Sequence, residues 1–171
     1  MANWKIKVPQ GTYKSDRTIS ESIAELQKAK TASGKELKEI SEFYSLPFYL
    51  VFAVATLESG GQSIRSFDGL SYGVMQTNAE TMDGVIKEVF KQGMTMGKFY
   101  PLYLDIKPLF TLKKPIPANF WDNSNIALRQ EPASNFLRYK GWEAWKSTKS
   151  TYNQKMMTNK PFAIRVGVLF L

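Results

Sequence analysis

The sequence predicts a mainly α-helical domain, and three observations lead to this fold class. Several stretches place apolar residues at the three- and four-residue spacing of an amphipathic helix. Ser, Thr and Asn residues stand at the starts of these stretches, where their side chains can cap a helix. The chain has 171 residues, of which 43% are hydrophobic, and this suffices for one domain with its own core.

We divide the chain into three parts. Residues 1–17 form an N-terminal extension, in which Trp4–Val8 alternates apolar residues with lysines and predicts a short strand, a small terminal β element. Residues 18–160 form the main domain. Residues 161–171 form an apolar C-terminal segment that needs cover. It could pair with the N-terminal strand, pack on a partner chain, or be the cut end of a longer polypeptide.

Two helices are expected before residue 47. A capping box at Thr18–Glu21 begins the first, which should stop near Thr31–Gly34. The second should run from about Lys35 to Tyr44, with its apolar residues on one face.

The stretch Pro47–Leu57 is apolar on every side, which predicts a helix buried at the centre of the core. It is too short to cross a membrane, which takes ~20 residues. Glu58 follows it, and Gly60 or Gly61 is expected to supply the left-handed position that ends the helix. The helix dipole and apolar surroundings both disfavour the ionised carboxylate there, which makes Glu58 a candidate general acid. A glutamate that caps a turn and points into water is the alternative.

The second half of the chain alternates loops and helices. Gln62–Leu70 is expected to be a polar loop at a cleft edge, and a capping box at Thr77–Glu80 begins an amphipathic helix that Gly93 ends. Residues 94–121 carry four prolines and six aromatic residues, which predicts a long irregular insertion. We prefer packing on the core for these rings, with stacking on sugars as the alternative.

Nearer the C-terminus, Asn123 or Ser124 could cap a helix that Pro132 breaks. Trp142 and Trp145 are three residues apart and should share one face of a helix, more for packing than as a sugar platform.

Composition excludes several kinds of chemistry. The chain has no cysteine and no histidine, so disulfides, thiol catalysis, His-based triads and His-ligated zinc are absent. Carboxylates, tyrosines and lysines remain for proton transfer, and we expect no cofactor or metal.

The net charge of +8 suits a polyanionic partner, but the scattered lysines predict no specific nucleic-acid binding. The first residues are too polar for a signal peptide.

Two motifs resemble the active-site signature of the lysozyme superfamily. They are closest to the soluble lytic transglycosylase type and to the lysozyme-like modules of phage tails. Glu58-Ser59-Gly60 matches the family's Glu-Ser-Gly, and Gly73-Val74-Met75-Gln76 matches its Gly-Leu-Met-Gln with one conservative change. The resemblance covers about Leu37 to Asn153. Weaker matches lie downstream, at Asn125-Ile126, Gly141–Trp145 and Thr151-Tyr152-Asn153.

The resemblance implies a lysozyme-like helical domain that cleaves the β-1,4 bond between N-acetylmuramic acid and N-acetylglucosamine in peptidoglycan. Glu58 would protonate the glycosidic oxygen. The remaining site residues would hold the glycan strand or orient Glu58: Ser71, Tyr72, Gly73, Met75, Gln76, Asn78 and Tyr152. The tyrosine could donate a hydrogen bond near Glu58, or it could lie on the surface.

One departure from the family pattern separates the mechanisms. Animal-type lysozymes carry an Asp before the Tyr-Gly, and here that position is Ser71. This favours a single-glutamate transglycosylase with a 1,6-anhydro product. If Asp68 or a positioned water acts instead, the enzyme would be a hydrolytic muramidase. A non-catalytic structural or glycan-docking particle component is the third hypothesis.

The Gly141–Trp145 match to phage-type members and the polar N-terminus suggest delivery by a virion or injection particle, with that particle's proteins as partners. No stretch predicts a transmembrane segment. The site of action would be the bacterial cell wall, in the periplasm.

Overall fold

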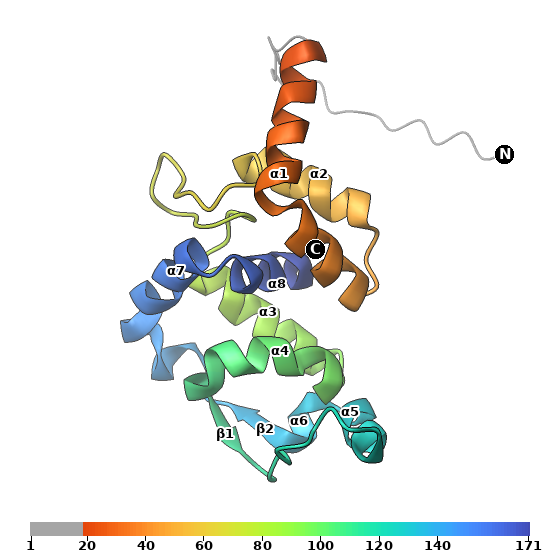
Figure 1. The fold of residues 1–171 in the computed structure, drawn as a ribbon. Helices are drawn as coiled ribbons and strands as arrows, with labels where there is room; N and C mark the ends of the chain where they lie inside the picture. The colour runs from red at the N-terminus through yellow and green to blue at the C-terminus, as the bar shows by residue number, and fades with distance from the viewer. Residues whose placement is uncertain (1–18) are drawn as a thin grey trace, which may run out of the picture.

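The computed structural model describes residues 19–171, and its secondary structure is mainly α-helical, as predicted. The predicted N-terminal strand lies outside the described residues. The main helices are α1 (Ile19–Phe43), α2 (Phe48–Ser59), α3 (Ala79–Lys91), α4 (Met96–Ile106), α5 (Ile126–Gln130), α6 (Ala133–Phe136), α7 (Lys149–Thr158) and α8 (Lys160–Phe170). Strands β1 (Phe110–Leu112) and β2 (Leu137–Tyr139) form an antiparallel ribbon at the opposite end of the molecule from α1 and α2 (Figure 1).

The apolar C-terminal segment is the helix around which the others pack. α8 lies against α1, α3, α4 and α7 (Figure 1). Its start is capped by Asn159, whose side chain accepts a hydrogen bond from the Phe162 N–H at 3.0 Å. Side chains on several sides of α8 are buried: Phe162, Ala163, Ile164, Val166 and Val168. Within residues 19–171, the cover that the segment needs therefore comes from the chain's own helices.

The predicted central helix occupies the edge of the molecule, so its predicted place is wrong. α2 packs on α1 and buries only Val51, Ala55 and Ser59. The side chains of Tyr49 and Leu57 are 81% and 86% exposed. When a helix is apolar on every side, its sequence does not indicate which side faces the core, because no polar side marks the one that faces water.

α1 is one helix where two were predicted. It runs through Gly34, because the turns on either side are held by packing, with Ala29 and Leu37 fully buried. Ser33 adds a buried hydrogen bond from its Oγ to the Gly61 carbonyl. Tertiary contacts of this kind outweigh the ~1 kcal/mol that a glycine costs inside a helix.

The predicted irregular insertion contains a regular helix. α4 begins after Thr95, whose Oγ1 accepts from the Lys98 N–H, and it continues through Pro101. The expectation of core packing is confirmed for several of its aromatic rings: Phe99, Phe110 and Phe120 are buried in the large core cluster. Trp145 is likewise buried against Trp142, with ring centroids 4.7 Å apart.

Other boundaries differ from the predictions by small amounts. Asn78, and not Thr77, caps α3, since its Oδ1 accepts from the Thr81 N–H at 2.8 Å. α5 ends before Pro132 as predicted, but a 3-10 turn at Asn123–Asn125 precedes it in place of a side-chain cap. Among residues 19–171, no helix is long and apolar enough to cross a bilayer.

A smaller core cluster positions the candidate site. It lies between α1, α2 and α8, and it includes Val74 and Met75 of the second motif, Gly73–Gln76. Its buried members are Leu37, Ile40, Val51, Ala55, Val74, Met75, Ile164 and Val168. The two predicted motifs therefore meet in one packed unit.

Candidate active site

Glu58 lies in the last turn of α2, and the helix ends directly after it. Gly60 takes the left-handed conformation, with φ of 62°, and its N–H bonds back to the helix carbonyls. This left-handed cap is the stop that the sequence predicted. It fixes the direction in which the chain leaves α2 and the place where Glu58 projects.

The Gly73–Gln76 motif forms a tight turn between two paired residues. Tyr72 and Thr77 exchange backbone hydrogen bonds at 2.8 and 3.2 Å. Gly73 has a φ of 76°, and a Cβ there would lie 2.4 Å from the Met156 carbonyl oxygen, so only glycine fits. Gln76 also has a positive φ, 47°, and its side-chain amide donates to the carbonyls of Gly73 and Ile64.

Ser59 ties this turn to the end of α2. Its side chain is buried, and its Oγ donates to the Val74 carbonyl at 2.7 Å. Met75 presses against α8 at Gly167, where an added Cβ would come within 2.3 Å of the Met75 Cβ. Ser59, the residue next to Glu58, is thus bonded to the Gly73–Gln76 turn, and this turn packs on α8.

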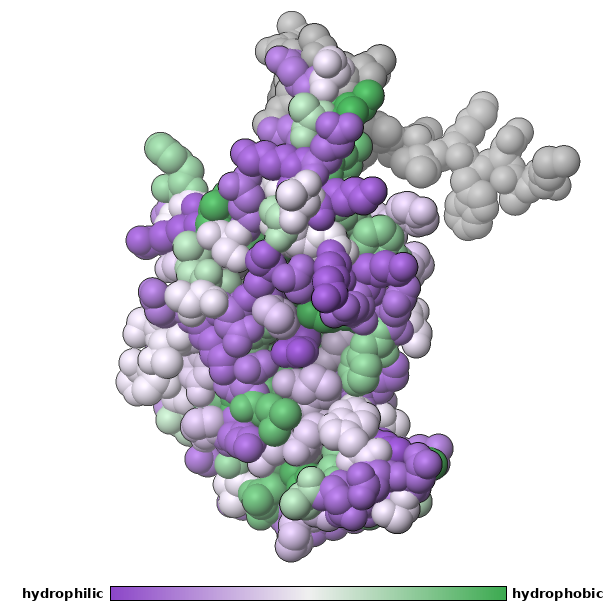
Figure 2. Space-filling view, in the orientation of Figure 1, coloured by the Kyte–Doolittle hydropathy of each residue, from purple (hydrophilic) through white to green (hydrophobic). Residues whose placement is uncertain are grey.

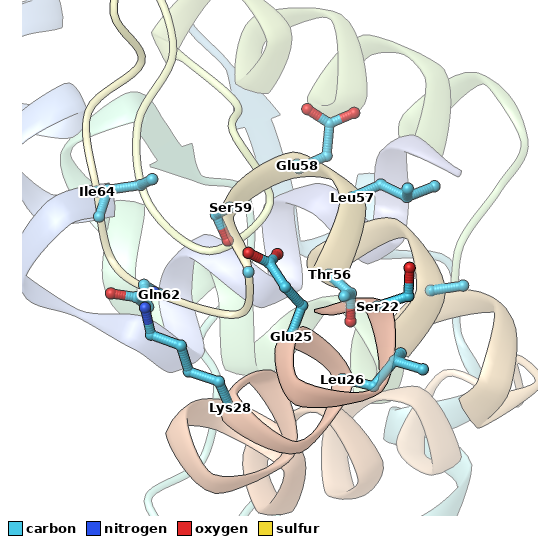
Figure 3. A pocket seen from close by; sticks show the side chains of 12 residues that line it. Ser22, Glu25, Leu26, Lys28, Thr56, Leu57, Glu58, Ser59, Gln62 and Ile64 are labelled. Atoms are coloured by element: carbon cyan, nitrogen blue, oxygen red, sulfur yellow. The ribbon is translucent and has the colours of Figure 1, made fainter. Parts of the chain in front are cut away.

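The Glu58 side chain is exposed and lines a hollow of about 600 Å³. α1 contributes Ser22, Glu25 and Lys28 to the wall, and the chain after α2 contributes Gln62 and Ile64. Figure 3 shows the Glu58 carboxylate pointing away from the Glu25 and Gln62 side chains. The carboxylate therefore stands at the rim of the hollow, and the apolar shelter predicted for it is not present.

Two predicted site residues line a different and smaller hollow. Tyr72 and Asn78 border a space of about 150 Å³ that Lys149 and Asn153 also line. Asn153 fixes one wall, because its Oδ1 accepts from the Ala79 N–H at 2.8 Å. The match Thr151–Asn153 is therefore close in space to the second motif.

Three of the predicted contact residues serve as support. Met75 is only 5% exposed and Gly73 is covered by α7, so neither presents a side chain to a ligand. Tyr152 is also buried, with its ring 5.2 Å from that of Trp145. Burial raises the pKa of its hydroxyl. Tyr152 therefore lies in the core and not on the surface, and among residues 19–171 it makes no hydrogen bond to Glu58.

The loop residues near the turn are held by local bonds. Ser71 donates its N–H to the Ser66 Oγ at 2.9 Å, and Gln76 is committed to the turn itself. Asp68, the candidate second carboxylate, accepts from the Ser66 hydroxyl and the Leu70 N–H. The hydrogen bond from Ser66 lowers the pKa of Asp68 most, and the bond from the Leu70 N–H lowers it further. Asp68 therefore shapes its own loop.

Sequence reasoning missed the wall that α1 provides. Ser22, Glu25 and Lys28 precede the resemblance, and nothing in their helical spacing marks them as site residues. Ser59 was part of the quoted motif, yet its role as a tie needs the spatial closeness of Val74 to be visible. Among residues 19–171, no group of three acidic side chains could hold a metal ion.

No protein-family model, curated protein or solved structure matches this chain.

Proposed function

We propose that this protein cleaves the glycan strands of peptidoglycan with Glu58 as its single catalytic carboxylate, as a lytic transglycosylase. The observation that carries the proposal is the placement of Glu58. It ends a helix beside a hollow of about 600 Å³, and its neighbour Ser59 is bonded to the Gly73–Gln76 turn. A helix end fixed by packing can hold an acid in place beside a bound chain of sugars.

In the proposed reaction, Glu58 first gives its proton to the oxygen between the two sugars. The bond from that oxygen to C1 of the muramic acid breaks, and the sugar's own 6-hydroxyl forms a new bond to C1. Glu58 then takes the proton of this hydroxyl, which restores the acid. One carboxyl group serves as acid and then as base, and the product is a 1,6-anhydro sugar.

The position of Asp68 supports the single-glutamate scheme over hydrolysis through two carboxylates. A second carboxylate must face the sugar across ~5–9 Å from the acid. The Oδ1 atom of Asp68 instead accepts two hydrogen bonds from within its own loop. Glu25 lines the hollow, but its carboxylate and that of Glu58 point in different directions (Figure 3).

The exposure of Glu58 adds one requirement to the scheme. Since the protein does not shelter the carboxyl, the glycan itself must cover it. Exposed apolar side chains near the rim, at Leu57 and Ile64, offer surface for this contact. Green, hydrophobic residues reach the surface around α1 and α2 in Figure 2.

Substitution of Glu58 tests the proposal. Wild type should clear a suspension of purified cell walls, and Glu58→Gln should lower the rate at least ~100-fold, because loss of a general acid costs that much. Glu42→Gln is the matched control, since Glu42 is an exposed glutamate of α1 that does not line the hollow. Equal rates for wild type and Glu58→Gln would contradict the proposal.

A docking protein that binds glycan without cleaving it is the second candidate. The exposure of Glu58 favours it, because a general acid is more often found in apolar surroundings. In that case wild type and Glu58→Gln would both bind insoluble peptidoglycan, and neither would clear it. Particle-borne delivery to the wall remains a proposal that rests on the tryptophan motif Gly141–Trp145.

A further inference from the structure

Charge is divided unevenly along the described chain. Residues 19–90 hold 6 basic and 10 acidic side chains, whereas residues 91–171 hold 13 basic and 4 acidic ones. The first part includes α1 and α2, and the second part includes the β1–β2 ribbon at the opposite end (Figure 1). Among residues 19–171, the excess of positive charge therefore belongs to residues 91–171, the part of the chain that forms the ribbon.

Seven of the thirteen cations of the second part have a carboxylate partner, and the cations at the ribbon, Lys113, Arg138 and Lys140, are not among them. Lys114 pairs with Glu131, and Lys146 pairs with Glu143. Lys113 and Lys140 instead donate to backbone carbonyls at 2.7 Å, those of Ser134 and Pro108. Within the described part of the chain, Arg138 is exposed and takes part in none of the ion pairs.

Two of these cations, Lys113 and Arg138, border a hollow at the ribbon. Arg138 lies directly across from Thr111, and alternate residues of a strand point to the same side. A hollow of about 440 Å³ is lined there by Thr111, Lys113, Ser134 and Arg138 together with apolar groups and Tyr139, and its lining includes no carboxylate. One acid is bonded to a lining residue: Asp83 accepts from the Tyr139 hydroxyl, and it also pairs with Lys87 at 2.7 Å.

The chemistry of this surface fits phosphate groups. A guanidinium presents parallel N–H donors to a phosphate, and an ammonium and a hydroxyl stand beside it. Lys140, which directly follows β2, adds a third cation two residues from Arg138, and a row of cations suits a chain of anions better than a single one.

The same surface does not suit nucleic acid. Proteins that bind single strands stack bases on exposed aromatic rings. The two rings in this lining, Phe90 and Tyr139, are packed against the large core cluster. The Tyr139 hydroxyl is also occupied, since it donates to Asp83 and accepts from the Trp145 indole.

We propose that the outer face of the β1–β2 ribbon, with Lys113, Arg138 and Lys140, docks a phosphodiester polymer that carries no bases, of the polyglycerol-phosphate type. This docking surface does not rest on the proposed function of Glu58. Its cations and the candidate active site belong to opposite ends of the chain's fold (Figure 1).

Binding of polyglycerol phosphate to the full chain tests the inference. The double variant Lys113→Ser/Arg138→Ser should bind at least ~10-fold more weakly than wild type, and the slope of log affinity against log salt should fall by about 2. The matched control is Lys146→Ser/Lys149→Ser, which removes the same charge from two cations that have acid partners. The control should bind nearly as wild type, and all three proteins should have the same thermal midpoint.

Several results would overturn the inference. Equal weakening in both double variants would show that net charge alone attracts the polymer. Tighter binding of a single-stranded DNA with the same number of phosphates would assign the surface to nucleic acid. Full competition by inorganic phosphate at the same phosphate concentration would reduce the surface to a single-anion pocket. Glycan cleavage should be unchanged in Lys113→Ser/Arg138→Ser, which separates this test from that of Glu58.

Discussion

At the scale of single residues, the least satisfied group in the described structure is the hydroxyl of Tyr44. It is buried, and no hydrogen-bond partner reaches it among the described residues. Burial raises the pKa of this hydroxyl; the nearby Arg165 charge lowers it in part, and Asp105 raises it further. A buried hydroxyl without a partner costs ~1–3 kcal/mol of folding free energy.

Tyr44→Phe should therefore stabilise the protein at neutral pH by about 1 kcal/mol, because it removes the unpaired hydroxyl and keeps the ring. The free energy of unfolding, from urea titrations, measures this. Tyr49→Phe is the control, since Tyr49 is 81% exposed and should show no change. Destabilisation by Tyr44→Phe would mean that the hydroxyl has a partner.

The same substitution should change the response to alkali. Because burial raises the pKa of Tyr44 above the ordinary tyrosine value of about 10, the folded state holds its proton after the unfolded state has lost it. This contribution is complete below pH ~10 and disappears as pH rises toward the folded pKa. Wild type should thus lose more stability than Tyr44→Phe between neutral pH and pH ~11.

The residue scale also shows what sequence could and could not say about the site. The motif placed Glu58 at a helix end before a glycine cap, and the structure has both. The predicted shelter is absent, because the shelter depends on what covers α2. Met75 and Tyr152 belong to the motifs because packing requires them, and a motif alone does not separate packing from contact.

At the scale of elements, α8 takes the central position that the sequence predicted for α2. Both are strongly apolar, yet α8 is enclosed by four helices and α2 leaves Tyr49 and Leu57 exposed. The amphipathic α3 was predicted well, because its apolar face is defined by its own polar residues. α4 was missed because the prolines and aromatic rings of residues 94–121 suggested a loop, although Pro101 is tolerated inside the helix.

Two glycine substitutions test how closely α8 holds the site. Gly167→Ala should destabilise the protein by about 2 kcal/mol, since the new Cβ would lie 2.3 Å from the Met75 Cβ. Gly84→Ala in α3 meets nothing within 4 Å and should stabilise it by up to ~1 kcal/mol. Urea unfolding gives both values. Stabilisation by both variants would show that α8 does not press on the Gly73–Gln76 turn.

At the scale of the whole molecule, one carboxylate joins three helices. Asp105 of α4 pairs with Lys155 of α7 at 3.0 Å and with Arg165 of α8 at 3.1 Å. Its side chain is 17% exposed, so these pairs are only partly screened by water. No pattern in the sequence joins positions 50 and 60 residues apart, which is why sequence reasoning did not find this network.

Asp105→Asn should destabilise the protein by ~2–3 kcal/mol, because two partly buried cations would lose their counter-charge. Glu143→Gln is the control: it breaks the pair with Lys146, in which the Glu143 side chain is 80% exposed. That loss should be at most ~0.5 kcal/mol. Thermal midpoints at low and high salt check both. Equal small losses would mean that the Asp105 network does not hold α4, α7 and α8 together.

The account as a whole depends on Glu58 as the acid that breaks a glycan strand. The most direct measurement is the mass of the fragments released from purified peptidoglycan by wild type, Glu58→Gln and Glu42→Gln. We expect 1,6-anhydro fragments from wild type and from Glu42→Gln, and none above background from Glu58→Gln. Release of the same fragments by Glu58→Gln at the wild-type rate would contradict the central claim.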